Sequence, residues 1–258
     1  TMIIKVCGMR DKDNILAVEN LGIYIMGFIF YPKSPRYFFN ENRNGNLDCN
    51  IDINISKKLH GNFKESHSNK HCENKDVNCE KNNYGNHNIL QHNYMPKKCK
   101  RAGVFVNMSL DEMLNLAKTL HLEYIQLHGE ESASFCREIK EAGYSVIKAF
   151  HIEKEDDITV IDKEYHCYCD IFLFDTKCAL YGGSGREFDW NILNRYEGPT
   201  PFLLSGGVGL DNLNDINIFH NPYLLGVDLN SKFESSPGVK DIALLKQYIT
   251  ELEKIKKS

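Results

Sequence analysis

The sequence lacks any long hydrophobic run. No stretch approaches the ~18 consecutive apolar residues of a membrane-spanning helix, and the first residues enter an apolar strand pattern without the charged and apolar regions of a signal peptide. It also lacks a concentration of positive charge, because the formal net charge is -4 and the basic residues are scattered. We therefore expect a soluble, cytoplasmic protein that binds neither membrane nor nucleic acid.

Regular cysteine spacings are missing as well. The chain has 9 cysteines, an odd number at irregular positions, which favours reduced thiols and argues against a disulfide framework. Four of them lie between residues 49 and 99 together with several histidines, and a zinc site there is the alternative to consider. Because that segment contains no C-x-x-C pair, we expect no metal site.

Residues 40–98 differ in composition from the rest of the chain. Asparagine recurs throughout this segment, and the apolar periodicity that marks helices and strands largely disappears. A structureless run of this length would normally count against an assignment to one compact domain. The change in composition is so abrupt that we predict a single domain over 1–258, with an Asn-rich, largely disordered insertion at 40–98 after the second strand.

Outside the insertion, short apolar runs alternate with helical patterns. The expected strands are Ile3–Gly8, Tyr24–Phe30, Ala102–Val106, Tyr124–Leu127, Ser145–Phe150, Asp170–Phe174, Phe202–Ser205 and Leu224–Leu229. Helix signals between them include a cap at Asp11 and a capping box from Ser109 to Glu112. Further helices are expected after Glu153 and over Asp189–Tyr196. Eight such repeats predict a (β/α)8 barrel of the TIM type. A doubly wound open sheet is the alternative, and no G-x-G-x-x-G motif follows the first strand to support it.

The first strand places a thiol at the end of the barrel where such enzymes work. Side chains alternate along a strand, so Ile3, Lys5 and Cys7 share one face, which we expect to be the inner one. The alternative for Cys7 is a small buried hydrophobic side chain. An inward Lys5 has to be paired, and Asp228 at the end of the last strand is its expected partner.

The carboxyl ends of the expected strands collect polar residues. These are Cys7, Arg36, His128 with Gln126 nearby, Asp175, Gly206, Gly207, Asp228, Asn230 and Ser231. In this type of barrel the loops after strands seven and eight bind phosphate. The backbone N–H groups at Gly206 and Gly207 and the side chains of Asn230 and Ser231 suit that role, although glycine pairs also mark ordinary turns.

Two of these residues suit general acid–base chemistry. Burial at a strand end would raise the pKa of Asp175 and keep its proton available, whereas nearby positive charge would lower the pKa of Cys7. The alternative for Asp175 is an ordinary loop carboxylate. Arg36 follows Pro35 and can bind a carboxylate through two hydrogen bonds, unless it is a solvated surface group. The Gly-rich segment from Thr176 to Arg186 suits a lid over the substrate.

Seven motifs, in order along the chain, resemble phosphoribosylanthranilate isomerase. They are Ile4-Lys5-Val6-Cys7-Gly8-Met9-Arg10, Phe30 through Arg36-Tyr37, Gly103-Val104-Phe105-Val106-Asn107, Gln126-Leu127-His128-Gly129, Asp175 with Gly182-Gly183-Ser184-Gly185 and Phe188-Asp189-Trp190, Ser205-Gly206-Gly207, and Gly226-Val227-Asp228 with Pro237-Gly238 and Lys240-Asp241. The resemblance covers the chain apart from the insertion. It implies the third step of tryptophan biosynthesis, an Amadori rearrangement of N-(5'-phosphoribosyl)anthranilate that requires neither cofactor nor metal.

The resemblance also implies a role for each site residue. Asp175 resembles the general acid that protonates the furanose oxygen, and Cys7 the general base that removes the C2' proton. Arg36 resembles the clamp for the anthranilate carboxylate, and Asp228 the residue on strand eight that faces the substrate. His128, in its motif, is placed with the substrate-binding residues. The phosphate site of the family falls on Gly206, Gly207, Asn230 and Ser231.

Two departures and two alternatives accompany this hypothesis. The family usually has a serine pair and a glycine where this chain has Asn230, Ser231 and Lys232, and the insertion occupies the place of the second helix.

The sibling aminoaldose isomerase of histidine biosynthesis would have an aspartate at the position of Cys7. A barrel that binds a phosphorylated small molecule without converting it is the non-enzymatic alternative. Fusion to, or association with, other tryptophan-pathway enzymes stays open.

Overall fold

The computed structural model describes residues 2–39, 95–152, 158, 161, 163–175 and 190–255. Three of the sequence predictions fall mainly outside these residues. They are the Asn-rich insertion up to residue 94, most of the helix expected after Glu153, and the Gly-rich lid segment 176–186.

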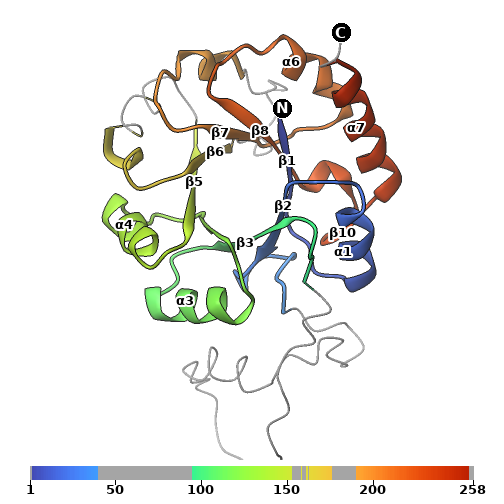
Figure 1. Ribbon diagram of the computed structural model, residues 1–258. Helices are drawn as coiled ribbons and strands as arrows, with labels where there is room; N and C mark the ends of the chain where they lie inside the picture. The colour runs from blue at the N-terminus through green and yellow to red at the C-terminus, as the bar shows by residue number, and fades with distance from the viewer. Residues whose placement is uncertain are drawn as a thin grey trace, which may run out of the picture. The chain divides into compact units, whose positions relative to one another are not determined.

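Eight parallel strands form a closed barrel, in the order β1 to β8 around the ring (Figure 1). Their bounds are Ile3–Val6 (β1), Ile25–Ile29 (β2), Lys100–Phe105 (β3), Tyr124–Leu127 (β4), Ser145–His151 (β5), Ile171–Asp175 (β6), Phe202–Ser205 (β7) and Leu224–Leu229 (β8). Strand β1 pairs with both β2 and β8, which closes the ring. The predicted barrel is therefore confirmed, and the open-sheet alternative is wrong.

The described helices lie outside the ring of strands (Figure 1). The α-helices are Lys12–Glu19 (α1), Leu110–Thr119 (α3), Ala133–Glu141 (α4), Leu213–Ile218 (α6) and Ile242–Ile255 (α7). Short 3-10 helices span Trp190–Arg195 (η2), Leu210–Asn212 (η3) and Ser231–Phe233 (η4), and a small antiparallel pair joins Glu234–Ser236 (β9) to Val239–Lys240 (β10). None of the helices in the described part of the chain has the length and apolar character needed to cross a bilayer.

Local capping agrees only in part with the sequence. Asp11 accepts a hydrogen bond from the backbone N–H of Asn14 (2.8 Å) and so caps α1 as predicted. The capping box at the start of α3 is wrong, because the hydroxyl of Ser109 donates to the carboxylate of Glu112 (2.5 Å) instead of accepting from the backbone. The helix predicted over 189–196 is a short 3-10 helix, η2, in the part of this range that the structure describes, 190–196.

The barrel interior is apolar towards the amino ends of the strands and polar towards their carboxyl ends. One buried cluster combines side chains from five strands, namely Ile25, Ala102, Ile147, Ala149, Ile171, Leu173 and Leu203. Members on one strand are two residues apart, as expected for side chains on one face. Continuing the same alternation carries β4 to His128, β5 to His151 and β6 to Asp175. The apolar layer thus supports a polar layer at the mouth of the barrel.

The chain joins the barrel again earlier than the sequence suggested. Met95 is buried, and the backbone N–H groups of Lys97 and Lys98 donate to the carboxylate of Glu19 at the end of α1. Strand β3 then begins at Lys100, two residues before its predicted start. Residues 95–98, which the sequence placed at the end of the insertion, therefore contact the barrel framework.

Candidate active site

A cavity of ≈ 300 Å³ opens at the carboxyl ends of the strands. Eight of the nine predicted site residues line it: Cys7, His128, Asp175, Gly206, Gly207, Asp228, Asn230 and Ser231. The side chains of Ile29, Val104 and Val106 add an apolar wall. The ninth predicted residue, Arg36, is not among the lining residues. Residues far apart in the sequence therefore share one cavity, as the barrel topology requires.

Cys7 lies directly after β1, and its side chain is only 3% exposed. Gly27 on the neighbouring strand β2 makes room for it, since a Cβ atom at Gly27 would lie 2.8 Å from the Cys7 sulfur. A residue larger than glycine at position 27 would therefore displace the Cys7 thiol. The predicted inward direction of Cys7 is confirmed by its contact with the cavity.

A buried ion pair lies one pleat below the thiol. Lys5 Nζ is 2.8 Å from Asp228 Oδ1, and both residues are almost inaccessible to solvent. The Ser205 hydroxyl donates to the other Asp228 oxygen at 3.3 Å. Burial alone would lower the pKa of Lys5, but the charges of Asp228 and Cys7 outweigh it and raise that pKa, so the ammonium stays charged. The predicted Lys5–Asp228 pair is confirmed.

Replacing Lys5 by methionine is expected to lower the free energy of unfolding by about 3–5 kcal/mol, because it leaves a buried carboxylate unpaired. Urea unfolding followed by circular dichroism measures this loss. The exposed Lys246 on α7 provides the matched control, and Lys246→Met should stay within about 0.5 kcal/mol of the wild type. If Lys5→Met were equally mild, the Asp228 carboxylate would not depend on Lys5.

The environment of Cys7 raises its pKa above the ordinary value of 9.0. Burial is the largest cause, since it disfavours the thiolate, and the Asp228 carboxylate acts in the same direction. Lys5 and Lys240 oppose this rise without cancelling it. Nearby positive charge therefore acts in the expected direction, but the expected net fall of the pKa of Cys7 is wrong, because burial and the Asp228 carboxylate outweigh the two lysines.

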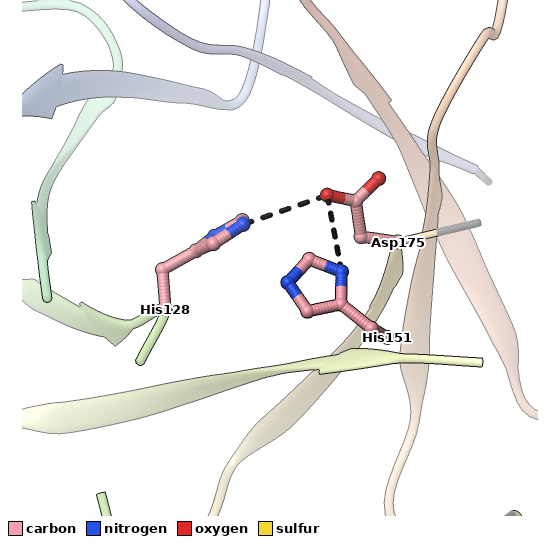
Figure 2. A group of neighbouring side chains, drawn as sticks. All are labelled: His128, His151 and Asp175. Carbon is pink, nitrogen blue, oxygen red and sulfur yellow. Dashed lines mark ion pairs between the residues drawn. The ribbon is translucent and has the colours of Figure 1, made fainter. Parts of the chain in front are cut away.

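Asp175 lies between two histidines at the mouth of the barrel (Figure 2). Its Oδ2 atom is 3.5 Å from His128 Nε2 and 3.8 Å from His151 Nδ1. Burial is the largest single influence and favours the neutral acid, but the hydrogen bond from His128 and the charges of both histidines together lower the pKa of Asp175 below 3.8. Burial acts in the predicted direction, but the expected net rise of the pKa of Asp175 is wrong.

The strands themselves set this arrangement. His151 and Asp175 are direct register partners on β5 and β6, and His128 follows the end of β4. The His128 Nδ1 atom is 3.0 Å from the side-chain nitrogen of the buried Gln126. His151 was missed from the sequence because strand five was expected to end at Phe150. His151 would have been found if the residue that directly follows each apolar run had been counted as part of the strand.

Arg36 is held by a carboxylate of the protein itself. Its Nε atom lies 2.9 and 3.0 Å from the two Glu234 oxygens, and Nη2 lies 2.6 Å from Oε2. The buried Lys240 donates to the same Glu234 at 2.7 Å and to Asn230 Oδ1 at 2.8 Å. These hydrogen bonds lower the pKa of Glu234 although burial, the largest influence, opposes them. Neither Glu234 nor Lys240 was predicted to belong to the site.

The loops after β7 and β8 form one wall of the cavity. Gly206 and Gly207 have φ values of 79° and 75°, a conformation that favours glycine and exposes backbone N–H groups. Asn230 and Ser231 face them at the start of η4. Lys232, one of the departures from the family pattern, also lines the cavity, and its ammonium pairs with Asp211 at 2.6 Å. Asp211 thus holds the lysine charge close to this wall.

Comparisons with known proteins agree on one family. The family model described as N-(5'phosphoribosyl)anthranilate (PRA) isomerase matches residues 54–251, which is more than half of the chain. A protein of Phocaeicola vulgatus named N-(5'-phosphoribosyl)anthranilate isomerase is 40% identical over 255 residues, which cover 98% of each chain. A protein of Parabacteroides distasonis with the same name is 40% identical over 251 residues, which cover 97% of this chain and 93% of that protein.

Solved structures give the same result. The crystal structure of phosphoribosyl anthranilate isomerase from Thermotoga maritima shares 27% identity, with a TM-score of 0.68 and coverage of 98% of this chain and all of that one. A phosphoribosyl anthranilate isomerase solved with reduced 1-(o-carboxyphenylamino)-1-deoxyribulose 5-phosphate shares 25% identity, with a TM-score of 0.67 and the same coverage.

Proposed function

Because the chain belongs to the N-(5'-phosphoribosyl)anthranilate isomerase family of tryptophan biosynthesis, we propose that Cys7 and Asp175 carry out the family reaction in the barrel cavity. The proposed substrate is N-(5'-phosphoribosyl)anthranilate, and the product is 1-(2-carboxyphenylamino)-1-deoxyribulose 5-phosphate. Asp175 donates a proton to the furanose oxygen as the C1'–O bond breaks, which leaves an iminium ion. Cys7 then removes the C2' proton, and the resulting enol becomes the ketone.

One observation carries this proposal: the thiol after β1 and the carboxyl group at the end of β6 line the same ≈ 300 Å³ cavity. The rearrangement needs an acid at the ring oxygen and a base at C2', two positions of one sugar. Proton transfers of this kind require heavy atoms within hydrogen-bond reach of each other. A cavity of this size fits a single phosphorylated sugar with its aromatic substituent.

The remaining lining residues suggest how the substrate is oriented. The backbone N–H groups around Gly206 and Gly207 and the side chains of Asn230 and Ser231 suit the phosphate. The apolar wall that includes Ile29 suits the aromatic ring. Arg36 suits the anthranilate carboxylate only in part, because it is not among the residues that line the cavity and Glu234 already binds its Nε and Nη2 atoms. We place the substrate carboxylate at the other edge of the guanidinium, where Nη1 offers further donors.

The protonation states of the free protein differ from those that the reaction uses. At neutral pH the lowered pKa of Asp175 favours the carboxylate, and the raised pKa of Cys7 favours the thiol. The reactive form, with the proton on Asp175 and off Cys7, is therefore a minor form of the free protein. A bound substrate brings a phosphate and a carboxylate into the cavity, and these negative charges raise the pKa of Asp175 towards the protonated state.

This arrangement fixes the expected pH dependence of kcat/KM. The pKa of Asp175 lies below 3.8 and the pKa of Cys7 lies above 9.0. Between these two values the two residues together carry one proton, so the fraction of protein in the reactive form does not change with pH. We expect kcat/KM to stay constant between about pH 6.5 and 8.5, above the titration of the substrate phosphate, and to fall at higher pH. Steady-state rates across this range measure it. A bell-shaped profile with both limbs inside the range would contradict the two pKa directions.

The loss of substrate fluorescence with purified protein tests the proposed function directly. We expect the protein to consume N-(5'-phosphoribosyl)anthranilate without any added cofactor. The second candidate is a barrel that binds phosphorylated ligands without converting them, which the phosphate-binding wall alone would also support. Calorimetry with the reduced product analogue, combined with the assay, separates the two. Binding without turnover would favour the second candidate.

A further inference from the structure

We propose that His128, His151 and Asp175 form a binding site for one divalent transition-metal ion such as Zn²⁺, and that the bound ion switches the isomerase off. The ligand atoms of these three residues lie within 4.8 Å of one another (Figure 2). They are the one such group with three metal-ligating side chains among the described residues. The sequence predicted no metal site. It did not bring these three residues together, because they follow or end different strands.

The distances are close to those of a tetrahedral zinc site. Ligands held 2.0–2.1 Å from a tetrahedral ion lie about 3.4 Å apart. The Asp175 oxygen is 3.5 Å from the His128 nitrogen and 3.8 Å from the His151 nitrogen. Both histidines point at the same carboxylate oxygen from neighbouring strands, as Figure 2 shows. The two histidine nitrogens lie within 4.8 Å of each other, so rotation of the imidazoles is needed to bring all three donors onto one ion.

The donor set selects the class of metal. Two imidazoles and one carboxylate suit Zn²⁺ and neighbouring transition metals, whereas Mg²⁺ and Ca²⁺ prefer oxygen ligands. Three protein ligands leave the fourth tetrahedral position for water or another small ligand. Two of the three residues, His128 and Asp175, line the cavity, so the open position is accessible from the substrate side.

Gln126 supplies the support that a metal-binding histidine needs. Coordination through His128 Nε2 requires the imidazole proton to sit on Nδ1, and such a proton is usually donated to an oxygen. The Gln126 side chain is 3.0 Å from Nδ1 and is 1% exposed. With its amide nitrogen towards the ring, its oxygen is buried without a hydrogen-bond partner. The reversed amide places that oxygen on the Nδ1 proton and fixes the tautomer that binds metal.

The backbone holds the site in place, and solvent can reach it. His151 and Asp175 are paired across β5 and β6, so their Cα atoms are fixed relative to each other. His151 is 42% exposed and Asp175 is 25% exposed, which leaves a route for the ion from solvent. A rigid pair of ligands at an open barrel mouth needs little ordering when the metal binds.

Inhibition rests on the proposed function of Asp175. A carboxylate bound to Zn²⁺ cannot hold the proton that the furanose oxygen requires, and the ion also occupies space beside the sugar. Metal binding itself does not depend on whether Asp175 acts as the acid. The two parts of the proposal can therefore be measured separately, by affinity and by rate.

The test uses the full chain without a histidine tag. Zn²⁺ binding is measured by competition with a chromophoric chelator, and the isomerase rate is measured over the same range of free Zn²⁺. We expect one ion per chain and a loss of rate that follows occupancy. His151→Asn should weaken Zn²⁺ binding at least about 100-fold, and Gln126→Leu about 10–100-fold. The exposed His220 provides the matched control, so His220→Asn should change neither value.

Cys7 is the competing ligand, since thiolates bind zinc well. We expect Cys7→Ser to keep its Zn²⁺ affinity, and Co²⁺ bound to the wild type to show no thiolate charge-transfer band. Loss of binding in Cys7→Ser with unchanged binding in His151→Asn would overturn the site. Stoichiometric binding that leaves the rate unchanged would overturn the switch and would also count against Asp175 as the acid. If wild-type protein were inactive without metal, the proposed function would fail while the binding measurement still tested the site.

Discussion

Replacing Cys7 by serine is expected to lower kcat by about 10²–10⁴-fold, the usual contribution of a general base. Serine keeps the size of the side chain and its place beside Gly27, but its hydroxyl is a far weaker acid than the thiol and cannot supply a useful base near neutral pH. KM should change little, because the sulfur acts on the C2' proton. Stopped-flow or steady-state loss of substrate fluorescence measures both constants.

The matched control for this change is another cysteine. Cys167 is exposed, lies before β6 and is not among the residues that line the cavity. Cys167→Ser should therefore keep the wild-type rate. If Cys7→Ser also turned over at nearly the wild-type rate, a different residue would remove the C2' proton and the role given to the thiol would be lost.

Replacing Asp175 by asparagine is expected to lower kcat by a similar 10²–10⁴-fold. The amide has nearly the same shape as the carboxyl group, and it can still contact His128 and His151, but it has no proton to transfer to the furanose oxygen. The substrate should still bind, because the phosphate wall and the apolar wall are unchanged. Calorimetry with the reduced product analogue measures the binding, and the fluorescence assay measures the rate.

The control for Asp175 is an exposed aspartate of the same barrel. Asp215 lies on α6 and is solvent-exposed, so Asp215→Asn should leave both binding and rate unchanged. A variant Asp175→Asn that remained fully active would mean that one of the neighbouring histidines delivers the proton. The role of general acid would then belong to that histidine and not to Asp175.

The barrel was predictable because each strand is a short apolar run between clear stop signals. Strands β4, β7 and β8 have the bounds expected from the sequence. Period-two alternation then placed Cys7 and Lys5 on the inner face, and an inward lysine needs a partner, which made Asp228 the natural choice. Inferences of this kind depend on local patterns and on the fixed order of strands in the barrel.

The electrostatics of the site were not predictable in the same way. The pKa of Asp175 depends on His128 and His151, and that of Cys7 on how burial and Asp228 balance the lysines. Those balances arise between residues on different strands, at distances that a sequence does not contain. The role of Glu234 at Arg36 has the same origin, because 198 positions separate the two residues in the chain.

The most direct test is a crystal structure of the protein with reduced 1-(o-carboxyphenylamino)-1-deoxyribulose 5-phosphate. If Cys7 and Asp175 act on one substrate, the carboxyl group should lie within about 2.6–3.2 Å of the hydroxyl derived from the ring oxygen. The Cys7 sulfur should face C2', and the phosphate should contact the loop at Gly206 and Gly207. A ligand whose C2' and ring-derived hydroxyl both point away from these two side chains would contradict the mechanism.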